Sequence, residues 1–236
     1  MKTMILAAGR GERLRPMTDT CPKPLLPIAG KPLIVHHIEA LARDGLREII
    51  INTAWLAEQF PAVLGDGSRY GVSIIYSFEG KAGLETGGGI LNALPLLGGE
   101  PFLLVNGDVH AEVDFASLSL PEGDLGHLLM VDPPAGSDGD FVLETDQAGN
   151  GRLHVDGDPR LTYSGIGILH PALFAGWHAG FTPKEVSGQP PHFRLAPLLR
   201  HAMRQNRISG RHHRGHWTDA GTPEALNALS TRFLES

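Results

Sequence analysis

Disulfides, membrane spans and a broad basic surface are all missing from this sequence of 236 residues. Its one cysteine, Cys21, cannot form an internal disulfide, so nothing indicates an oxidising compartment. No apolar stretch approaches the roughly 20 residues that a helix needs to span a bilayer. The net charge of −6 has the wrong sign for a broad nucleic-acid-binding face. We therefore expect a cytoplasmic protein that binds neither membranes nor nucleic acid.

The sequence also has no internal repeat, no low-complexity tract and no convincing linker. With 42% hydrophobic residues, it can bury a substantial core. The apolar opening, residues 4–8, stops at Gly9 and is followed by three arginines, so it predicts a first buried strand rather than a signal peptide. We expect a single domain over residues 1–236.

A glycine-rich loop crowded with cations follows that first strand. Glycine at positions 9 and 11 lets the backbone turn sharply and bring N–H groups close to an anion. Four cations minus two acids leave residues 9–23 with a charge of +2: Arg10, Arg13, Arg15 and Lys23 against Glu12 and Asp19. A basic loop on an acidic protein predicts a localised anionic ligand, such as a phosphate.

Other phosphate-binding loops fit less well. A dinucleotide-binding fingerprint needs a third glycine where Leu14 stands, and an acidic residue after the second strand, where Asn52 stands. A P-loop needs Gly-Lys-Ser/Thr after four intervening residues, which is absent. A solvated surface turn remains the alternative for an isolated Gly-x-Gly, although this one ends in a lysine, Lys23, between two prolines.

Residues 6–16 and the Pro-Lys-Pro at 22–24 resemble the signature of the sugar-phosphate nucleotidyltransferases. The resemblance continues through Val-Asn-Gly-Asp at 105–108 and Trp-Thr-Asp-Ala-Gly-Thr-Pro at 217–223, and it covers nearly the whole chain. It implies an enzyme that uses Mg²⁺ to join a nucleoside triphosphate and a sugar 1-phosphate, releasing pyrophosphate. It also implies a nucleotide-binding half, residues 1–110, and a sugar-binding half, residues 111–236. The oligomeric state stays open.

The order of elements predicts an α/β fold. Strands at 4–8, 48–52, 72–76 and 102–105 alternate with helices at 31–44, 55–64 and 90–97, which predicts a doubly wound, mostly parallel sheet. Ligands of such sheets bind beyond the carboxyl ends of the strands, where the loop 9–23 and Asp108 fall. Strands at 128–131, 141–144, 153–155 and 162–169 predict a small extra sheet over the sugar site. A loop over 176–191 and helices at 193–206 and 223–234 follow.

The resemblance assigns roles to individual residues. Arg13 and Lys23 match the family's catalytic cations, which neutralise charge on phosphate oxygens. Asp108 and Asp219 match the carboxylates that bind magnesium, a role that suits the preference of Mg²⁺ for one or two carboxylates and substrate phosphates. Without the resemblance, residues 106–108 would be interpreted as a simple turn.

Further residues are expected to contact the two substrates. The glycine-rich residues 85–90 precede the helix expected from Ile90, and their backbone would lie against the nucleobase. The nucleotide-binding residues are expected to be Leu6, Ala8, Gly9, Gly11, Glu12, Arg13, Lys23, Thr86 and Gly88. The sugar-binding residues are expected to be Asn106, Asp140, Gly165 and Arg194, the last as a partner for a substrate carboxylate.

Within the family, six segments resemble the N-acetylmuramate 1-phosphate uridylyltransferases of peptidoglycan recycling: residues 51–56, 84–90, 102–108, 139–141, 164–166 and 195–200. UTP is therefore the expected nucleotide. The alternatives are a mannose 1-phosphate guanylyltransferase or another member of the family, and a catalytically silent subunit that binds a nucleotide sugar. A nicotinamide-dependent oxidoreductase is disfavoured by Leu14 and Asn52. A metal site at His212, His213 and His216 is disfavoured by the neighbouring arginines.

Overall fold

The computed structural model describes residues 1–146, 149–181 and 186–235. The chain groups into two compact units, each assembled from separate segments of sequence. Unit 1 comprises Met1–Gly83, Val105–Ala116 and His216–Ser236, and unit 2 comprises Leu84–Leu104 and Ser117–Gly215. The expectation of one domain, with a boundary near residue 110 between its two halves, stays a prediction.

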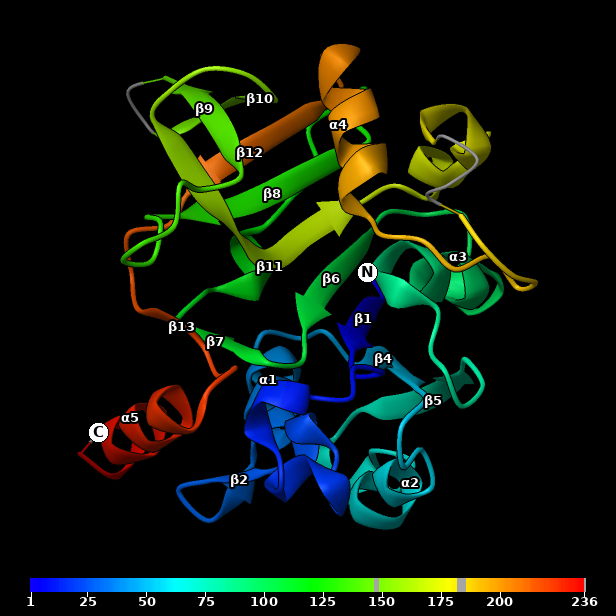
Figure 1. The fold of residues 1–236 in the computed structure, drawn as a ribbon, viewed down its shortest axis with the longest axis vertical. Coiled ribbons are helices and arrows are strands. Elements are labelled where there is room, and N and C mark those ends of the chain that lie inside the picture. The colour runs from blue at the N-terminus through cyan, green and yellow to red at the C-terminus, as the bar shows by residue number, and fades with distance from the viewer. Residues whose placement is uncertain (147–148, 182–185, 236) are drawn as a thin grey trace. The chain divides into compact units, whose positions relative to one another are not determined.

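Unit 1 contains a parallel sheet in the order β5-β4-β1, which Figure 1 shows in its blue and cyan part. Its strands are β1 (Thr3–Leu6), β4 (Glu48–Thr53) and β5 (Ser73–Phe78), and its helices are α1 (Leu33–Arg43), α2 (Gln59–Leu64) and α5 (Pro223–Glu235). Five of the six residues of β4 are buried, the continuous apolar pattern of a strand covered on both faces.

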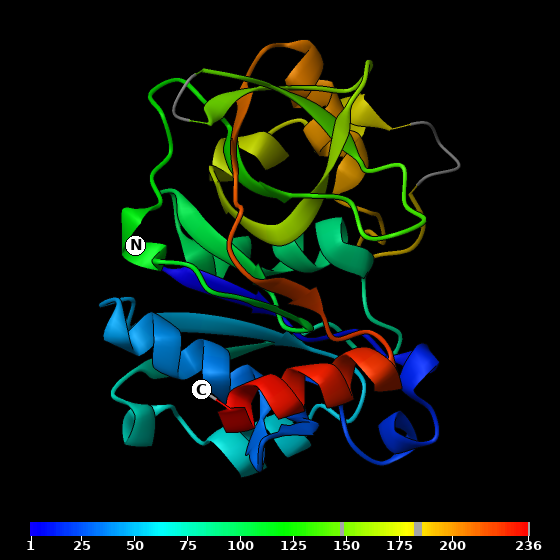
Figure 2. The ribbon, with the colours of Figure 1, turned by 90° about the vertical axis from the view of Figure 1, so that its left-hand side faces the viewer.

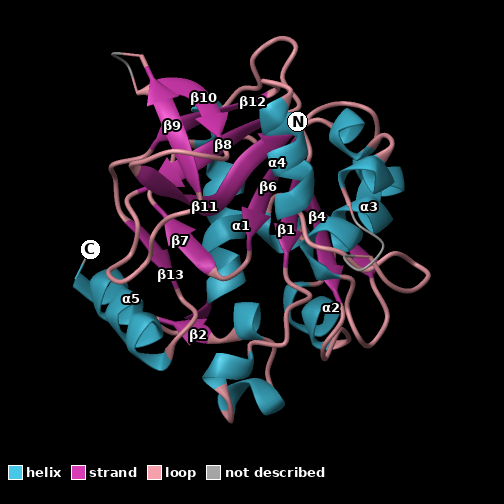
Figure 3. Cartoon of the chain, turned by 45° about the horizontal axis from the view of Figure 1, so that its top comes forward, coloured by secondary structure: helices cyan, strands magenta, loops and turns pink. Residues whose placement is uncertain are grey.

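Two short ribbons complete unit 1. β2 (Pro27–Ile28) pairs with β3 (Lys31–Pro32), and β7 (Val109–Ala111) pairs with β13 (Trp217–Asp219), both antiparallel. Figure 3 shows β7 and β13 side by side. The second ribbon joins two parts of the chain that are more than 100 residues apart, and it brings the segment after Asp108 alongside Asp219. β6 (Phe102–Asn106) contributes its last two residues to unit 1 and the others to unit 2.

A hydrophobic cluster in unit 1 lies beneath the residues expected to be functional. Helix α5, drawn in red in Figure 2, contributes to it on one side. The members are Leu14, Leu26, Ile28, Leu33, Ala220, Leu226 and Leu229. Leu14 directly follows Arg13, and Ala220 directly follows Asp219. Because these neighbours are buried, the backbone that carries both polar side chains is anchored in the core.

Unit 2 has a sheet in the order β11-β8-β12-β10-β9, and β11 also pairs with β9, so the order closes on itself. Its strands are β8 (Gly126–Val131), β9 (Phe141–Thr145), β10 (Asn150–His154), β11 (Arg160–Leu169) and β12 (Ile208–His212). Of the pairs given for these strands, β8 with β12 is parallel and the others are antiparallel. The helices of this unit are α3 (Glu85–Leu97) and α4 (Ala196–Arg204).

The strands predicted from the sequence are confirmed, with ends shifted by a few residues. The helix expected from residue 55 begins only at Gln59, and the helix expected from Ile90 begins at Glu85. The glycines at 87–89 are therefore the first turns of α3 rather than a loop before it. Within the expected loop 176–191, residues 177–180 form a 3₁₀ helix, and residues 182–185 lie outside the described residues.

In the described part of the chain, no helix combines the length and the apolar composition that crossing a membrane requires.

Candidate functional site

Lys23 lies between the two expected metal-binding carboxylates in unit 1. Its Nζ is 2.7 Å from Oδ2 of Asp108 and 3.7 Å from Oδ1 of Asp219. The lysine is 6% exposed, which is rare for this residue type unless it is paired. Three residues that are separated in the sequence by up to 196 positions (219 − 23) therefore form one charged cluster.

The local sequence explains why Lys23 faces inward. Residues Lys23–Leu25 form a short 3₁₀ helix between Pro22, which precedes it, and Leu26, which ends it. Pro24 within the turn fixes the backbone, and Leu25 and Leu26 are buried. The predicted clamping of the lysine by two prolines is consistent with this conformation.

Arg13 approaches the same cluster from the glycine-rich loop. Its guanidinium is 3.7 Å from Oδ2 of Asp219, and its side chain is 67% exposed, so a phosphate can reach it from solvent. Gly221 makes room for this arrangement. A Cβ at position 221 would lie 2.9 Å from Cζ of Arg13 and equally close to Oδ1 of Asp219, nearer than real Cβ contacts occur.

The two carboxylates are brought together by the β7–β13 ribbon. Asp219 is opposite Val109 in that ribbon, and the N–H of Ala220 donates to the backbone oxygen of Asp108 at 2.8 Å. Oδ1 of Asp219 is buried and has no hydrogen-bond partner among the described residues. A buried carboxylate oxygen without a donor fits a cation ligand, so the pair suits a divalent metal held jointly with substrate phosphates.

The described residues contain no group of three or more His, Cys, Asp or Glu side chains arranged to hold a metal ion. His212, His213 and His216, which are close to Asp219 in the sequence, belong to no such group among these residues. His212 contacts Asp132 in unit 2 at 3.0 Å. In unit 1, burial lowers the pKa of His37 and of His110 to about 4, so both are neutral at physiological pH.

Burial raises the pKa of the Cys21 thiol, the opposite of what a reactive thiolate needs.

The glycine-rich loop begins where β1 ends. Gly11 has φ +67°, and a Cβ there would lie 3.0 Å from Cβ of Lys23, so glycine is required by both conformation and space. The side chain of Trp55, two residues after the end of β4, packs against this loop. Trp55 donates to the backbone oxygen of Thr18 at 2.9 Å, and the Arg10 guanidinium lies 4.4 Å from the centre of the Trp55 ring. The remaining residues expected to bind the nucleotide, Leu6, Ala8, Gly9 and Glu12, lie at the end of β1 and in this loop.

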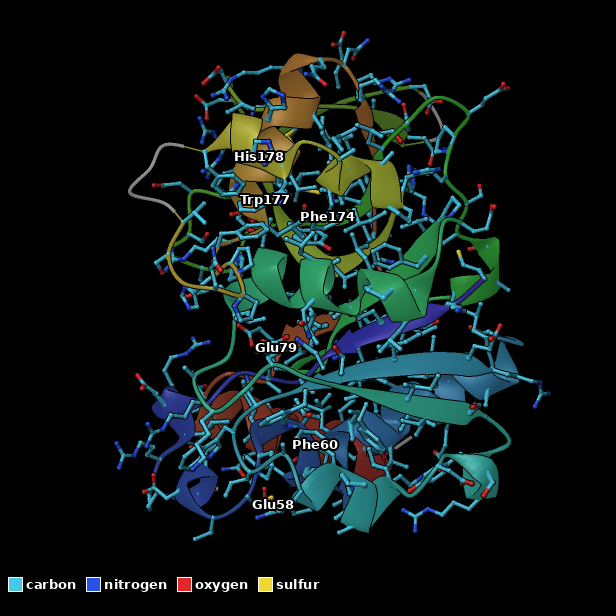
Figure 4. All side chains as sticks on the ribbon, turned by 90° about the vertical axis from the view of Figure 1, so that its right-hand side faces the viewer. Glu58, Phe60, Glu79, Phe174, Trp177 and His178 are labelled. Atoms are coloured by element: carbon cyan, nitrogen blue, oxygen red, sulfur yellow. The ribbon has the colours of Figure 1, made fainter. Side chains whose placement is uncertain are left out.

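Thr86 and Gly88 belong to α3 in unit 2. The glycines at 87 and 88 make close contact with the segment 191–194 of the same unit. Both N–H groups donate to the backbone oxygen of Phe193 at 3.0 Å, and a Cβ on Gly87 would lie 2.5 Å from the Phe193 ring. The ring of Phe193 in turn stacks on Trp177 (labelled in Figure 4) at 4.7 Å. Packing within unit 2 therefore explains why residues 87 and 88 are glycines, independently of any ligand at Thr86.

The expected sugar-binding residues divide between the units. Asn106 ends β6 and belongs to unit 1, whereas Asp140, Gly165 and Arg194 belong to unit 2. Oδ2 of Asp140 accepts a hydrogen bond from the backbone N–H of Tyr163 at 2.8 Å, which fixes the exposed carboxylate. Gly165 has φ +81° and lies where the pairing of β11 with β8 shifts register. The Arg194 guanidinium is 78% exposed and 3.8 Å from Glu85.

Three residues beside the charged cluster and the glycine-rich loop were not anticipated from the sequence. Gly221 packs against Arg13, and the buried side chains of Asn52 and Glu79 are joined by a hydrogen bond of 2.6 Å. In the sequence, Asn52 served only to disfavour a dinucleotide-binding fold, because it is not acidic. Gly221 was one residue of the motif at 217–223 and had no role of its own. The position of Glu79, immediately after β5, was a usable signal, because Asn52 and Asp108 also lie within two residues of the carboxyl end of a strand.

Comparison with known proteins gives a consistent result. The family model described as nucleotidyl transferase matches residues 2–119. An N-acetylmuramate alpha-1-phosphate uridylyltransferase of Neisseria meningitidis serogroup B is 54% identical over 94% of both chains. A protein of the same name from Caulobacter vibrioides is 30% identical, over 99% of this chain and 97% of its own.

Among solved structures, a Bacillus anthracis protein assigned as a glucose-1-phosphate thymidylyltransferase, in complex with a sucrose, superposes with a TM-score of 0.80. It is 21% identical, and the match covers 98% of this chain and 94% of that one. The predicted α/β fold is confirmed by this similarity, and two small two-stranded sheets, β2 with β3 and β7 with β13, are present as well.

Proposed function

The chain belongs to the nucleotidyl transferase family, and we propose that it joins UTP to N-acetylmuramate 1-phosphate, giving UDP-N-acetylmuramate and pyrophosphate. The observation that carries the reaction type is the cluster of Lys23, Asp108, Asp219 and Arg13 in unit 1. The choice of substrates rests on the Neisseria relative, which is 54% identical along nearly its whole length. Such a reaction belongs to the cytoplasmic recycling of peptidoglycan.

In the proposed reaction, a phosphate oxygen of the sugar 1-phosphate bonds to the α-phosphorus of UTP, and the bond from that phosphorus to the bridging oxygen of pyrophosphate breaks. Negative charge grows on the oxygens around the α-phosphorus and on the leaving group. Residues act by positioning the substrates and neutralising this charge. Lys23 supplies a compact ammonium, and Arg13 supplies a fork that can hold two phosphate oxygens at once.

Asp108 and Asp219 would hold Mg²⁺, which supplies polarisation of the phosphate oxygens. In the structure, Nζ of Lys23 lies 2.7 and 3.7 Å from oxygens of the same two carboxylates. With the carboxylates holding the metal, the Lys23 ammonium would be available to a phosphate oxygen of the substrates.

For the rest of the substrates, we retain the residues that the resemblance indicates. The backbone of Leu6, Ala8, Gly9 and Gly11, with Glu12, binds the nucleotide phosphates and ribose. Thr86 binds the base, and Gly88 supports it by packing the start of α3 against residues 191–193. Asn106, Asp140 and Gly165 bind the sugar. Arg194 is the candidate partner of the lactyl carboxylate, and it is available because its contact with Glu85 is long and exposed.

The test is a pyrophosphate-release screen of purified protein with UTP, GTP, dTTP and CTP against a panel of sugar 1-phosphates, with and without Mg²⁺. The proposal predicts the highest rate for UTP with N-acetylmuramate 1-phosphate, and release that depends on the metal. No release with any pair would contradict the nucleotidyltransferase activity, and release with another pair would correct the substrates alone.

A further inference from the structure

The peptide group that joins Leu6 to Ala7 is held on both sides. Its carbonyl oxygen accepts a hydrogen bond from the N–H of Gly107 at 2.8 Å. Its N–H donates to Oδ1 of Asn52 at 2.7 Å, a contact between groups 45 residues apart. Gly107 fits because it has no side chain: a Cβ would lie 2.6 Å from the Leu6 oxygen. This one peptide therefore links the start of the phosphate loop to the residue before Asp108.

Asn52 is itself oriented by a second side chain. Its Nδ2 donates to Oε1 of Glu79 at 2.6 Å. An asparagine amide carries one acceptor and one donor end, and a carboxylate can only accept. Glu79 therefore directs the NH₂ group of Asn52 toward itself and the oxygen toward Ala7. Both side chains are buried, with 2% exposure for Asn52 and 6% for Glu79, so solvent competes little for these hydrogen bonds.

The parallel sheet puts these groups at the same edge. Leu6, the last residue of β1, is opposite Asn52, one residue before the end of β4. Thr53 and Phe78, the last residues of β4 and β5, are opposite each other. The N–H of Glu79, labelled in Figure 4, continues the ladder by donating to the oxygen of Thr53 at 2.9 Å. The side-chain hydrogen bonds of Asn52 and Glu79 therefore lie where the backbone ladder of the sheet ends. This is the carboxyl edge, where such sheets bind ligands.

We propose that Asn52 and Glu79 are a positioning pair for the proposed nucleotidyl transfer. By fixing the Leu6–Ala7 peptide, they hold the loop from Ala8 to Gly11 in its phosphate-binding conformation and, through Gly107, hold Asp108 in place. The inference rests on the proposed function, because it concerns the same reaction. In a dinucleotide-binding fold, the position of Asn52 would carry the acidic residue that binds the ribose. Here Asn52 instead accepts a hydrogen bond from the backbone N–H of Ala7.

A merely structural pair would make a different prediction. Two buried polar side chains that satisfied each other could be removed with a loss of stability and no change in the substrates' kinetics. A positioning pair acts on the loop, so its loss raises KM for the nucleotide more than KM for the sugar phosphate. It also frees the amide of Ala7 to exchange with solvent in the absence of any substrate.

The experiment compares Asn52→Ala with Tyr76→Phe. The control removes a hydrogen bond of similar length, 2.6 Å from the Tyr76 hydroxyl to the oxygen of Gly65, from the strand next to Asn52. Hydrogen exchange of ligand-free protein is followed in peptides covering residues 5–11. We expect at least tenfold faster exchange at Ala7 in Asn52→Ala and no change in Tyr76→Phe. With UTP, KM should rise on the order of tenfold in Asn52→Ala and stay within about twofold in the control.

Glu79 gives a second comparison, which also serves if Asn52→Ala does not fold. Glu79→Gln keeps an oxygen that can accept from Asn52, so it should retain KM for UTP within about threefold, whereas Glu79→Ala should resemble Asn52→Ala. A Glu79→Gln variant as impaired as Glu79→Ala would overturn the positioning role. Unchanged KM and exchange in both alanine variants would do the same. Wild-type protein that releases no pyrophosphate would instead contradict the proposed function, while the exchange result would still test the hold on the peptide.

Discussion

Replacing Lys23 by alanine should have opposite effects on metal binding and on catalysis. Lys23 lies between the two carboxylates that we assign to Mg²⁺, 2.7 Å from Asp108 and 3.7 Å from Asp219. The ammonium and a metal ion compete for the same oxygens. Its removal should therefore strengthen binding of the metal alone, and at the same time remove the cation that neutralises the phosphate in the reaction.

The geometry sets the size of each effect. At the 2.7 Å between Nζ of Lys23 and Oδ2 of Asp108, Coulomb's law gives about 1.5–6 kcal/mol for effective dielectric constants of about 80 to 20. Asp108 is 38% exposed, so the lower end applies, and tenfold tighter Mg²⁺ binding, about 1.4 kcal/mol, is expected. Loss of a cation at developing charge is worth about 2.7–4 kcal/mol, which predicts a decrease in kcat of about 100- to 1,000-fold.

Mg²⁺ titration by calorimetry without substrates, followed by steady-state pyrophosphate release, measures both effects on one protein. Lys31→Ala is the matched control, because Lys31 makes an equally short contact, 2.7 Å to Glu39, between exposed side chains of the same unit. It should change neither quantity. The reasoning would be refuted by weaker metal binding in Lys23→Ala, or by a raised KM with an unchanged kcat, which would make Lys23 a uniform substrate binder.

Three further predictions concern the same unit. Asp108→Asn and Asp219→Asn should each lower turnover by orders of magnitude at limiting Mg²⁺ while the protein still folds; near-normal turnover would exclude the metal assignment. Gly107→Ala should destabilise the protein by about 1–3 kcal/mol in urea unfolding, because its Cβ would meet the Leu6 oxygen at 2.6 Å, and unchanged stability would mean that this approach is not fixed. Because burial lowers the pKa of His37 to about 4, the unfolded chain binds this proton near pH 6.5 and the folded chain does not, so stability should fall between pH 6.5 and 4. His37→Leu should make that decrease shallower, and an identical slope would assign it to other groups.

Much of the fold could be predicted because its signals are local. The buried run in β4 and the apolar spacing of α1 follow from the pattern of neighbouring residues, and both elements were predicted within a few residues. Helix α3 was placed too late, because three glycines normally oppose a helix. Its first turns are stabilised by N–H groups of Gly87 and Gly88 that bond to Phe193, more than 100 residues away, a contact that no local pattern contains.

The candidate site could likewise be predicted only where its signals are local. The motif residues Arg13, Lys23, Asp108 and Asp219 could be named from their resemblance to a family, and the structure places all four in one cluster. That Lys23 pairs with both carboxylates could not be read from the sequence, because it depends on the β7–β13 ribbon closing over a separation of more than 100 residues. In the sequence, Asp108 and Asp219 are simply polar residues next to short strands, and nothing local indicates that they pair with Lys23.

The most direct test of the account is the ratio of kcat/KM for UTP with N-acetylmuramate 1-phosphate to that with N-acetylglucosamine 1-phosphate. The two sugars differ by the lactyl group, and a site that pairs its carboxylate rejects an analogue that leaves polar groups unpaired. We predict a ratio of at least about ten, the factor that corresponds to about 1.4 kcal/mol. Equal use of the two sugars, or a clear preference for GTP with mannose 1-phosphate measured in the same assay, would contradict the proposed substrates.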